Sequence, residues 1–272
     1  MINICAALHC EAKPFIARYG MKRQLRHKPF QVFEGERARL VVTGTGGVNA
    51  GCGVAYLLAS NAPDSNDIII NIGTAGSVRF AAGTAVACNK AVNAATGKVF
   101  YPEMIWKHPF AEGSVATHVK PVSAGDIDMD CDMADMECGF FYEAALFFMP
   151  AHRIHIVKIV SDNLDPGSVT KEDIEALARR NVHVISEWMD GLQEGLPERA
   201  SPAPEESAFL DALSARMKLS QAMDMKLRGA FARCKDSGAD AMAALAPFSH
   251  VTCHDKRERN AIYADALGKL AQ

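Results

Sequence analysis

The sequence predicts an α/β protein with a largely parallel central sheet, helices on both faces of the sheet, and a helical segment at the C-terminus. Through residues 2–193, apolar runs typical of buried strands alternate with helical patterns, as in sheets whose strands are joined by crossover helices. The strand pattern then stops, and residues 208–272 are helix-rich. Polar or glycine-rich residues follow several of the apolar runs, and ligands bind at the carboxyl ends of strands in such sheets.

The chain opens with a strand and a helix, and two further strands follow. Residues 2–8 form an apolar run, and residues 11–19 have a helical pattern with Pro14 in the first turn, where proline is tolerated. Segments 30–34 and 38–43 predict two strands, because a Glu-Gly-Glu turn separates two apolar runs. The basic run KRQLRHK that precedes them is predicted to be a solvated face or loop.

Two glycine-rich segments follow predicted strands. TGTGGVNAG (43–51) opens a helix that extends to about Ser60, and GTAGS (73–77) follows the apolar strand 67–72 as a second turn. Glycine allows a close approach of the backbone to a ligand, and successive N–H groups bind anions, so we expect both turns to lie beside a small ligand. The first segment departs from a dinucleotide fingerprint, because no acidic residue ends the next strand. Tight turns without a ligand are the alternative.

The region from 84 to 193 predicts a series of shorter elements. They are strands near 84–89, 98–101 and 119–123, a helix over 137–148 that ends before Pro150, a buried strand over 153–160, and a helix over 169–193.

A change of composition divides the chain. GLPERASPAPEES (195–207) holds three prolines in a polar run, which is typical of a linker. We therefore expect a domain of residues 1–194, a linker of residues 195–207, and a helical extension of residues 208–272 that ends in a helix near 256–270. The extension is interpreted as a cap over the pocket, an addition to a subunit interface, or a docking arm.

Composition limits the possible functions. The net charge is −3, with 29 basic and 32 acidic residues, and no basic stripe with interleaved aromatics predicts nucleic-acid binding. No apolar stretch reaches the roughly 18 residues of a membrane span, and the N-terminus lacks a signal-peptide pattern, so we expect a cytoplasmic enzyme. The eight cysteines contain no CxxC pair and are predicted to be reduced, buried thiols. We expect no metal and no cofactor.

Three acidic residues predict one shared pocket. Glu11, Glu137 and Asp162 each lie at or near the end of an apolar run, where a carboxylate is costly unless it is paired or solvated in a cleft. A pocket that cleaves a bond to a sugar needs such a set, to activate water, hold hydroxyls and protonate a leaving group. Taken singly, each acid has a structural alternative as a helix cap or turn residue.

Five segments together resemble the nucleoside phosphorylase/nucleosidase superfamily, and most of all its methylthioadenosine/S-adenosylhomocysteine nucleosidase branch. They are ALHCEAKPFI (7–16), TGTGGVNA (43–50), IINIGTAGS (69–77), DMECGFF (135–141) and IVSDNLD (159–165). The resemblance covers roughly residues 1–193 and implies a three-layer α/β/α fold around a mixed, partly barrel-like sheet. It also implies a homodimer or larger homo-oligomer, a nucleoside substrate and a role in purine nucleoside metabolism.

The same resemblance implies roles for individual residues. Glu11 matches the glutamate that activates water, Glu137 the glutamate that holds the ribose 2′ and 3′ hydroxyls, and Asp162 the aspartate that delivers a proton to purine N7. Further substrate-binding positions implied by the motifs are Thr74, Ala75, Gly76, Met136 and Ser161.

The nucleophile is predicted to be water. In the phosphorylase branch an arginine commonly precedes the second glycine turn, and here that position is Asn71. The resemblance therefore favours an N-ribosyl hydrolase over a phosphate-dependent phosphorylase, which is a glycosyltransferase. The phosphorylase alternative stays open, because a phosphate site needs cations that are available at Arg79, Arg18 or Arg23. A third alternative is a non-catalytic nucleoside-binding or interaction module whose working surface is the helical extension.

The aromatic partner of the base is left open by the motifs. The stretch VSAGDIDMD (122–130) lacks the phenylalanine that stacks on the base in the family. Four aromatic side chains are candidates for this contact: Trp106, Phe110, Tyr101 and Phe140.

Overall fold

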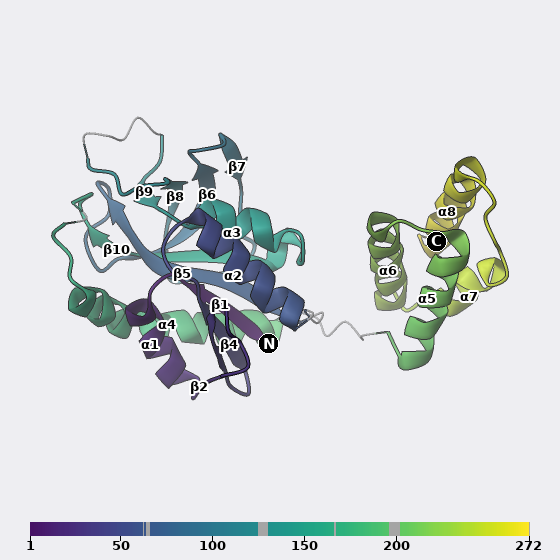
Figure 1. The fold of residues 1–272 in the computed structure, drawn as a ribbon, viewed down its shortest axis with the longest axis horizontal. Helices are drawn as coiled ribbons and strands as arrows, with labels where there is room; N and C mark the ends of the chain where they lie inside the picture. Colours follow the sequence, from purple (N-terminus) through teal and green to yellow (C-terminus); the bar gives the residue numbers. More distant parts are fainter. Residues whose placement is uncertain (62, 64–65, 125–129, 166, 196–201, 272) are drawn as a thin grey trace. The chain divides into compact units, whose positions relative to one another are not determined.

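The chain forms two compact units, Met1–Pro197 and Glu198–Gln272. A computed structural model describes residues 1–61, 63, 66–124, 130–165, 167–195 and 202–271. The first unit is built around one sheet and the second is helical (Figure 1). Within the described residues, no helix combines the length and the apolar character that a membrane span requires.

Over its described residues, the first unit contains a mixed sheet of ten strands. The strands are β1 (Ile2–Ala6), β2 (Lys22–Arg23), β3 (Gln31–Glu34), β4 (Ala38–Val42), β5 (Ile68–Ser77), β6 (Ala85–Asn93), β7 (Lys98–Phe100), β8 (Ala111–Thr117), β9 (Met133–Asp135) and β10 (Ile154–Asp162). β10 pairs with both β5 and β6, and β8 and β9 complete the path from β6 back to β5. Five strands thus close into a barrel-like ring, while β1, β4, β3 and β2 extend the sheet from β5.

Helices cover both faces of this sheet and make a three-layer α/β/α arrangement, so the predicted fold class is confirmed. The helices of the first unit are α1 (His9–Arg18), α2 (Gly47–Ser60), α3 (Cys138–Ala145) and α4 (Lys171–Gly195). The position of β5 between two layers of helices explains why its sequence is continuously apolar. Ile68 and Ile70 pack with α1 and α4, whereas Ile69 packs with α2 and α3. Because successive side chains of a strand point to opposite faces, a strand covered on both faces is apolar at every position.

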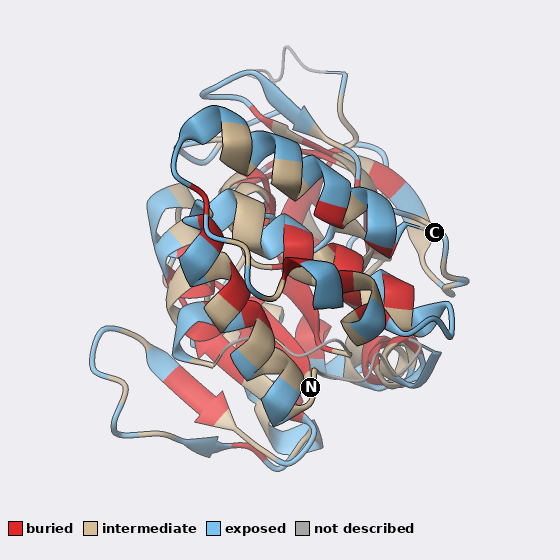
Figure 2. Cartoon of the chain, turned by 90° about the vertical axis from the view of Figure 1, so that its right-hand side faces the viewer, coloured by how far each residue is buried: buried red, intermediate tan, exposed pale blue. Residues whose placement is uncertain are grey.

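Burial follows this layered arrangement of a sheet covered by helices. Figure 2 shows buried positions along the strands and exposed positions on the outer sides of the helices. On α4, Leu177, Ile185 and Met189 are buried in the core shared with β5 and β10. The spacing of these residues matches the 3.6-residue period of an amphipathic helix.

The short strands around the ring differ from those predicted. The strand expected over 119–123 is wrong, because the chain is extended over Ala111–Thr117 instead. The sequence of β8, AEGSVAT, holds small and polar residues, and such residues give a weak strand pattern. β2 and β9 were not predicted either, since runs of two and three residues are too short for a periodic signal.

The second glycine-rich segment is a strand rather than a turn. Residues 73–77 continue β5 without a break and pair with β10 and β9. Their small side chains allow close packing: a Cβ added to Gly73 would lie 3.2 Å from both Glu11 Oε1 and Lys158 Nζ. The glycine at this position makes room for two ionisable side chains.

In the part of the second unit that the structure describes, four α-helices share a core of their own. They are α5 (Pro204–Met217), α6 (Gln221–Asp236), α7 (Ala241–Leu245) and α8 (Lys256–Leu270). Leu210, Leu227, Phe231 and Leu245 are fully buried in this core. α5 begins inside the stretch 195–207 that the sequence suggested as a linker, and residues 196–201 of that stretch lie outside the described residues.

Candidate active site

A cavity of ≈ 300 Å³, taken as the volume open to the centre of a water-sized sphere, lies at the carboxyl ends of β1, β5 and β10. This volume is at the lower end of the range for small-molecule pockets, roughly 300–1,000 Å³. All eight residues singled out from the sequence line it: Glu11, Thr74, Ala75, Gly76, Met136, Glu137, Ser161 and Asp162. They come from α1, β5, the β9–α3 junction and the end of β10.

Glu11 is fixed by hydrogen bonds to both carboxylate oxygens. It lies in the first turn of α1 with 4% of its surface exposed. The Thr74 backbone N–H and hydroxyl donate to Oε1 at 2.8 and 2.9 Å, and the Leu8 N–H donates to Oε2 at 2.9 Å. The Leu8 contact belongs to a capping box, which favours an acid at this helical position. Glu11 therefore both caps the helix and lines the cavity.

Glu137 stands at the N-cap of α3 and is 7% exposed. The Gly46 N–H, at the end of the first glycine-rich loop, donates to its Oε1 at 2.8 Å. Burial, reinforced by the nearby Asp135 and Glu11 carboxylates, raises the pKa of Glu137 to about 7, although Lys158 and the Gly46 N–H act in the opposite direction. The carboxyl therefore exchanges its proton near neutral pH.

A buried ion pair that sequence reasoning missed lies behind these carboxylates. Lys158 Nζ is 2.9 Å from Asp135 Oδ2, with side-chain exposures of 1% and 0%. Burial alone would lower the pKa of Lys158, but the Asp135 carboxylate holds it well above its usual value. Burial would raise the pKa of Asp135, and Lys158 together with Cys138 and Thr117 lowers it. The available signal was a lysine inside the apolar run IHIVKIV, because a buried charge needs a partner.

Asp135 also connects the ring to α3. The Cys138 N–H donates to its Oδ2 at 2.9 Å and the Thr117 hydroxyl to its Oδ1 at 2.6 Å. The Gly139 N–H donates in turn to the Thr117 hydroxyl at 2.8 Å. These contacts satisfy two of the free N–H groups at the start of α3. They also hold Glu137 at the cavity, because it lies between Asp135 and Cys138 in the sequence.

Asp162 ends β10 at an irregularity of the strand. The register of β10 on β5 shifts between Val160 and Asp162, and bulges of this kind re-aim side chains, often beside active sites. The Ser161 hydroxyl donates to Asp162 Oδ2 at 2.5 Å and the Asp165 N–H to Oδ1 at 2.8 Å. A Cβ added to Gly76 would lie 3.0 Å from Asp162 Oδ1 and 2.7 Å from Leu164 Cδ2, so the acid fits closely over β5.

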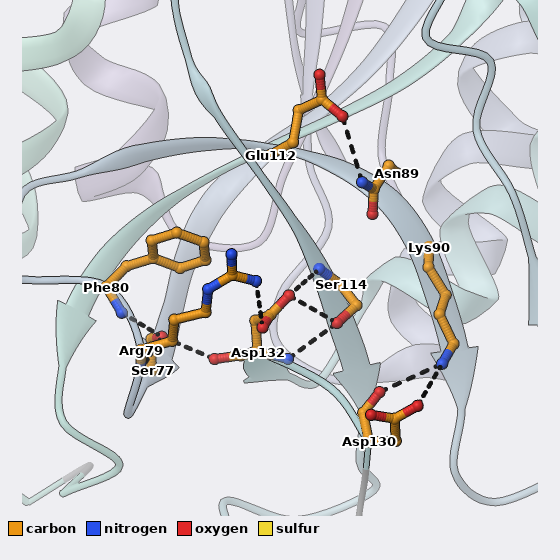
Figure 3. A network of polar contacts seen from close by, with 9 residues as sticks. All are labelled: Ser77, Arg79, Phe80, Asn89, Lys90, Glu112, Ser114, Asp130 and Asp132. Atoms are coloured by element: carbon orange, nitrogen blue, oxygen red, sulfur yellow. Dashed lines mark hydrogen bonds and ion pairs between the residues drawn. The ribbon is translucent and has the colours of Figure 1, made fainter.

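A second polar network supports β9, the strand that leads to Glu137 (Figure 3). The Ser114 N–H and hydroxyl donate to Asp132 Oδ2 at 2.8 and 2.9 Å, and Arg79 donates to Oδ1 at 2.7 Å. The Ser77 hydroxyl donates to the Asp132 carbonyl at 2.7 Å. The network ties the start of β9 to β5 and β8 and thereby limits where Glu137 can move.

The arginines proposed for a phosphate site do not line the cavity. Arg79 is paired with Asp132 and stacks on Phe80, 4.9 Å from the ring centroid. Arg18 pairs with Asp190 at 3.7 Å, and Arg23 lies in the exposed strand β2. Among the described residues around the cavity, the one basic side chain is that of Lys120.

The aromatic candidates for stacking on the base also lie elsewhere. None of Trp106, Phe110, Tyr101 and Phe140 is among the described residues that line the cavity. Trp106 and Phe110 pack against the core around α4, and Tyr101 is 69% exposed. Phe140 lies against Gly47 of α2, where an added Cβ would clash with its ring. Residues 125–129 of the VSAGDIDMD stretch lie outside the described residues.

The cysteines and other metal-binding side chains form no recognisable metal site in the described part of the chain. All eight cysteines are free thiols. No group of three or more His, Cys, Asp or Glu side chains there is arranged to hold a metal ion.

Comparison with solved structures relates this fold to known enzymes. The chain is similar to a 5′-methylthioadenosine/S-adenosylhomocysteine nucleosidase from S. pneumoniae, with 20% identity, a TM-score of 0.60, and coverage of 70% of this chain and 99% of that one. It is also similar to a 5′-methylthioadenosine nucleosidase from Arabidopsis thaliana, with 18% identity, a TM-score of 0.59, and coverage of 70% of this chain and 95% of that one. A Helicobacter pylori nucleosidase variant with 5′-methylthioadenosine in its active site is similar as well. Its identity is 14%, the TM-score is 0.58, and the match covers 70% of this chain and 98% of that one. No protein-family model and no curated protein matches the sequence. The fold is that of these nucleosidases, with additional C-terminal helices.

Proposed function

We propose that this protein hydrolyses the N-glycosidic bond of a purine nucleoside or 5′-thio-nucleoside. The observation that carries the proposal is the gathering of Glu11, Glu137 and Asp162 around one cavity in a fold shared with nucleosidases. The fold alone would leave the activity open, because one fold supports many functions. The carboxylates supply the chemistry that the reaction requires.

Glu11 is the proposed general base. The three hydrogen bonds to its carboxylate fix its orientation, and a general base must be held within hydrogen-bond reach of the water that it deprotonates. As the water oxygen bonds to C1′, the bond from C1′ to the purine nitrogen breaks, and the water proton passes to Glu11. The positive charge that develops on the ribosyl ring is stabilised by the carboxylates around it.

Glu137 and Asp162 act on the two parts of the substrate. In its ionised form Glu137 accepts hydrogen bonds from the ribose 2′ and 3′ hydroxyls and orients the sugar. Asp162 in its protonated form delivers a proton to N7 of the purine, which leaves as a neutral base. The Ser161 hydroxyl, 2.5 Å from Asp162, holds the acid toward the base. The products are the free purine and the free sugar.

Water is the proposed nucleophile rather than phosphate. A phosphate site uses arginine or lysine donors, and Arg79 and Arg18 are engaged elsewhere. Lys120, the basic residue among the described cavity residues, is exposed. Lys158 is buried and paired with Asp135. This distribution of charge supports hydrolysis.

Incubation of the full chain with adenosine, inosine and 5′-methylthioadenosine, with and without phosphate, tests the proposal. We expect free purine and free sugar without phosphate, at a rate that phosphate does not raise. A phosphate requirement with a sugar 1-phosphate product would show a phosphorylase instead. Release of no base from any purine nucleoside, under conditions in which the chain is folded, would contradict the proposal. A Glu11→Gln chain is the control for contaminating activity.

A further inference from the structure

Both tryptophans of the chain line one small cavity that shares no residue with the candidate active site. Trp106 lies in the segment between β7 and β8, and Trp188 lies on α4. His155 of β10 and His108, which lies between β7 and β8, also line this cavity. The volume open to the centre of a water-sized sphere is ≈ 10 Å³, close to the roughly 10–15 Å³ that one water molecule needs.

Four ring nitrogens at this cavity are shielded from solvent and have no hydrogen-bond partner among the described residues: Trp106 Nε1, Trp188 Nε1, His108 Nδ1 and His155 Nε2. His155 is 5% exposed, and the His108 side chain is 8% exposed. A buried polar group without a partner costs on the order of 1–3 kcal/mol, and buried polar atoms in folded proteins are nearly always paired. Four such atoms at one cavity indicate a common partner.

The rings are arranged around Trp188. The His155 ring centroid is 5.5 Å from that of Trp188 with an interplanar angle of 77°, and the His108 centroid is 6.4 Å away at 82°. The Cζ3 atom of Trp106 lies 3.3 Å from a Cβ built on Gly195, so its Nε1, at the opposite end of the indole, is directed away from Gly195.

The hydrogen-bonding capacity of the four nitrogens is balanced. Indole nitrogens donate only, whereas a neutral imidazole has one donor and one acceptor nitrogen. Burial and the neighbouring His152 lower the pKa of His155 to about 4, so its ring is neutral at neutral pH and its Nε2 can accept a hydrogen bond in the Nδ1–H tautomer. His108 Nε2 faces Glu112 Oε1 at 3.6 Å, which favours a proton on Nε2 and leaves Nδ1 as an acceptor. Two donors and two acceptors match the four hydrogen bonds of one water molecule.

We propose that this cavity is a binding site for one buried water molecule, held by the indole N–H groups of Trp106 and Trp188 and donating to two histidines. The water would connect the segment 102–108 to β10 and α4. The site is independent of the proposed catalytic function, since the two cavities share no residue.

Nuclear magnetic resonance of the ¹⁵N-labelled full chain tests this site directly, because its two indole signals both come from the cavity. Trp106→Phe and Trp188→Phe assign the signals. We expect both indole protons to show direct cross-relaxation with a long-lived water. Bromide, added at constant ionic strength as a probe for an anion site, should cause no saturable shift of either indole signal. In His155→Leu we expect the water contact to weaken at both indoles. If that chain does not fold, His108→Leu supplies the same comparison.

His183→Leu is the matched control, because His183 lies on α4 with its side chain 77% exposed, and it should leave both signals unchanged. Absence of water contact at both indoles would overturn the proposal and show a dry cavity. A saturable bromide shift of both signals would also overturn it, because the ligand would then be an anion.

Discussion

At the residue scale, the buried charges beside the active-site cavity differ in how they are compensated. Glu11 accepts three hydrogen bonds, and Asp135 is paired with Lys158. Among the hydrogen bonds between described residues, Glu137 accepts the one from the Gly46 N–H. It also faces two other carboxylates. Desolvation and like charge both favour the protonated form of a carboxyl, so Glu137 changes charge near neutral pH.

The proposed acid gives a direct prediction. Asp162→Asn should lower kcat by roughly 10²–10⁴-fold, the usual contribution of a general acid, with an unchanged circular dichroism spectrum. Asp165→Asn is the matched control, because it lies three residues away, is exposed, and contacts Asp162 through its backbone N–H. Equal kcat in Asp162→Asn and the unaltered chain would remove Asp162 from the mechanism.

The pKa of Glu137 predicts a pH dependence of activity. Because ribose binding uses the ionised carboxylate, the pH profile of kcat/KM should contain a step that rises with pH and has its midpoint near 7, since kcat/KM reports the free enzyme. The residual activity of Glu137→Gln should lack this step. A rise of the same size and midpoint in Glu137→Gln would assign the step to another group.

The same shift affects stability. The folded protein keeps the Glu137 proton up to about pH 7, whereas the unfolded chain loses it near 4.5. Between these values the folded state binds more protons, so the contribution of Glu137 to the free energy of unfolding falls as pH rises and is constant above both. In urea unfolding, the free energy of unfolding of Glu137→Gln minus that of the unaltered chain should therefore be higher at pH 8 than at pH 5.

Lys158 should be among the most costly positions to change. Lys158→Met leaves the Asp135 carboxylate buried and unpaired, and losing one partner of a buried ion pair costs about 3–5 kcal/mol. Urea unfolding measures the loss. The double variant Lys158→Met with Asp135→Asn should recover part of it, because no charge is then left unpaired. A single variant within 1 kcal/mol of the unaltered chain, about the worth of a surface pair, would contradict this account.

At the element scale, β5 and β10 bring the site together. They lie side by side as parallel strands over most of their length. β5 contributes Thr74 and Gly76 to the cavity, and β10 contributes Asp162. Parallel strands end at the same edge of a sheet, so residues far apart in sequence meet there.

Gly76→Ala should displace the acid without unfolding the protein. The added methyl would lie 2.7 Å from Leu164 Cδ2 and 3.0 Å from Asp162 Oδ1, so the loop after β10 must shift. A displacement of about 1 Å can cost roughly 10²-fold in rate, which steady-state kinetics measures. Gly191→Ala is the control, because nothing lies within 4 Å of its added Cβ and alanine favours a helix. Equal kcat/KM in the two variants would contradict the close fit of Asp162 over β5.

The sequence predicted the elements with strong periodic or apolar patterns. The run DIIINI marks β5, and the apolar run at 153–160 marks β10, because both strands are buried on two faces. β8 was misplaced, since its small residues carry no such pattern. The three acids were identified from their positions just past or beside apolar runs. Lys158 was not, because its partner Asp135 is distant in sequence and only the fold brings them together.

At the scale of the whole molecule, each unit has its own hydrophobic core. The core of the first unit joins the sheet to α1, α2, α3 and α4. Phe231, Leu245 and their neighbours form the core of the second. A segment with its own core can in principle fold alone.

A chain of residues 1–197 should therefore fold and keep the proposed activity, and a chain of residues 198–272 should fold into helices by itself. Circular dichroism with thermal unfolding measures the two folds, and nucleoside hydrolysis measures the first. Cooperative unfolding of 198–272 is expected even though small domains are marginally stable. Loss of activity in a folded 1–197 chain would show that the second unit contributes to the reaction.

The irregularity at Ser161 has a consequence for how closely functional groups can be spaced. In an unbroken strand, neighbouring side chains point to opposite faces of the sheet. Val160 pairs with Ala75 and Asp162 with Gly76, which leaves Ser161 as the extra residue. Both Ser161 and Asp162 consequently line the cavity. The strand thus places an acid and its own hydroxyl donor next to each other on the cavity wall.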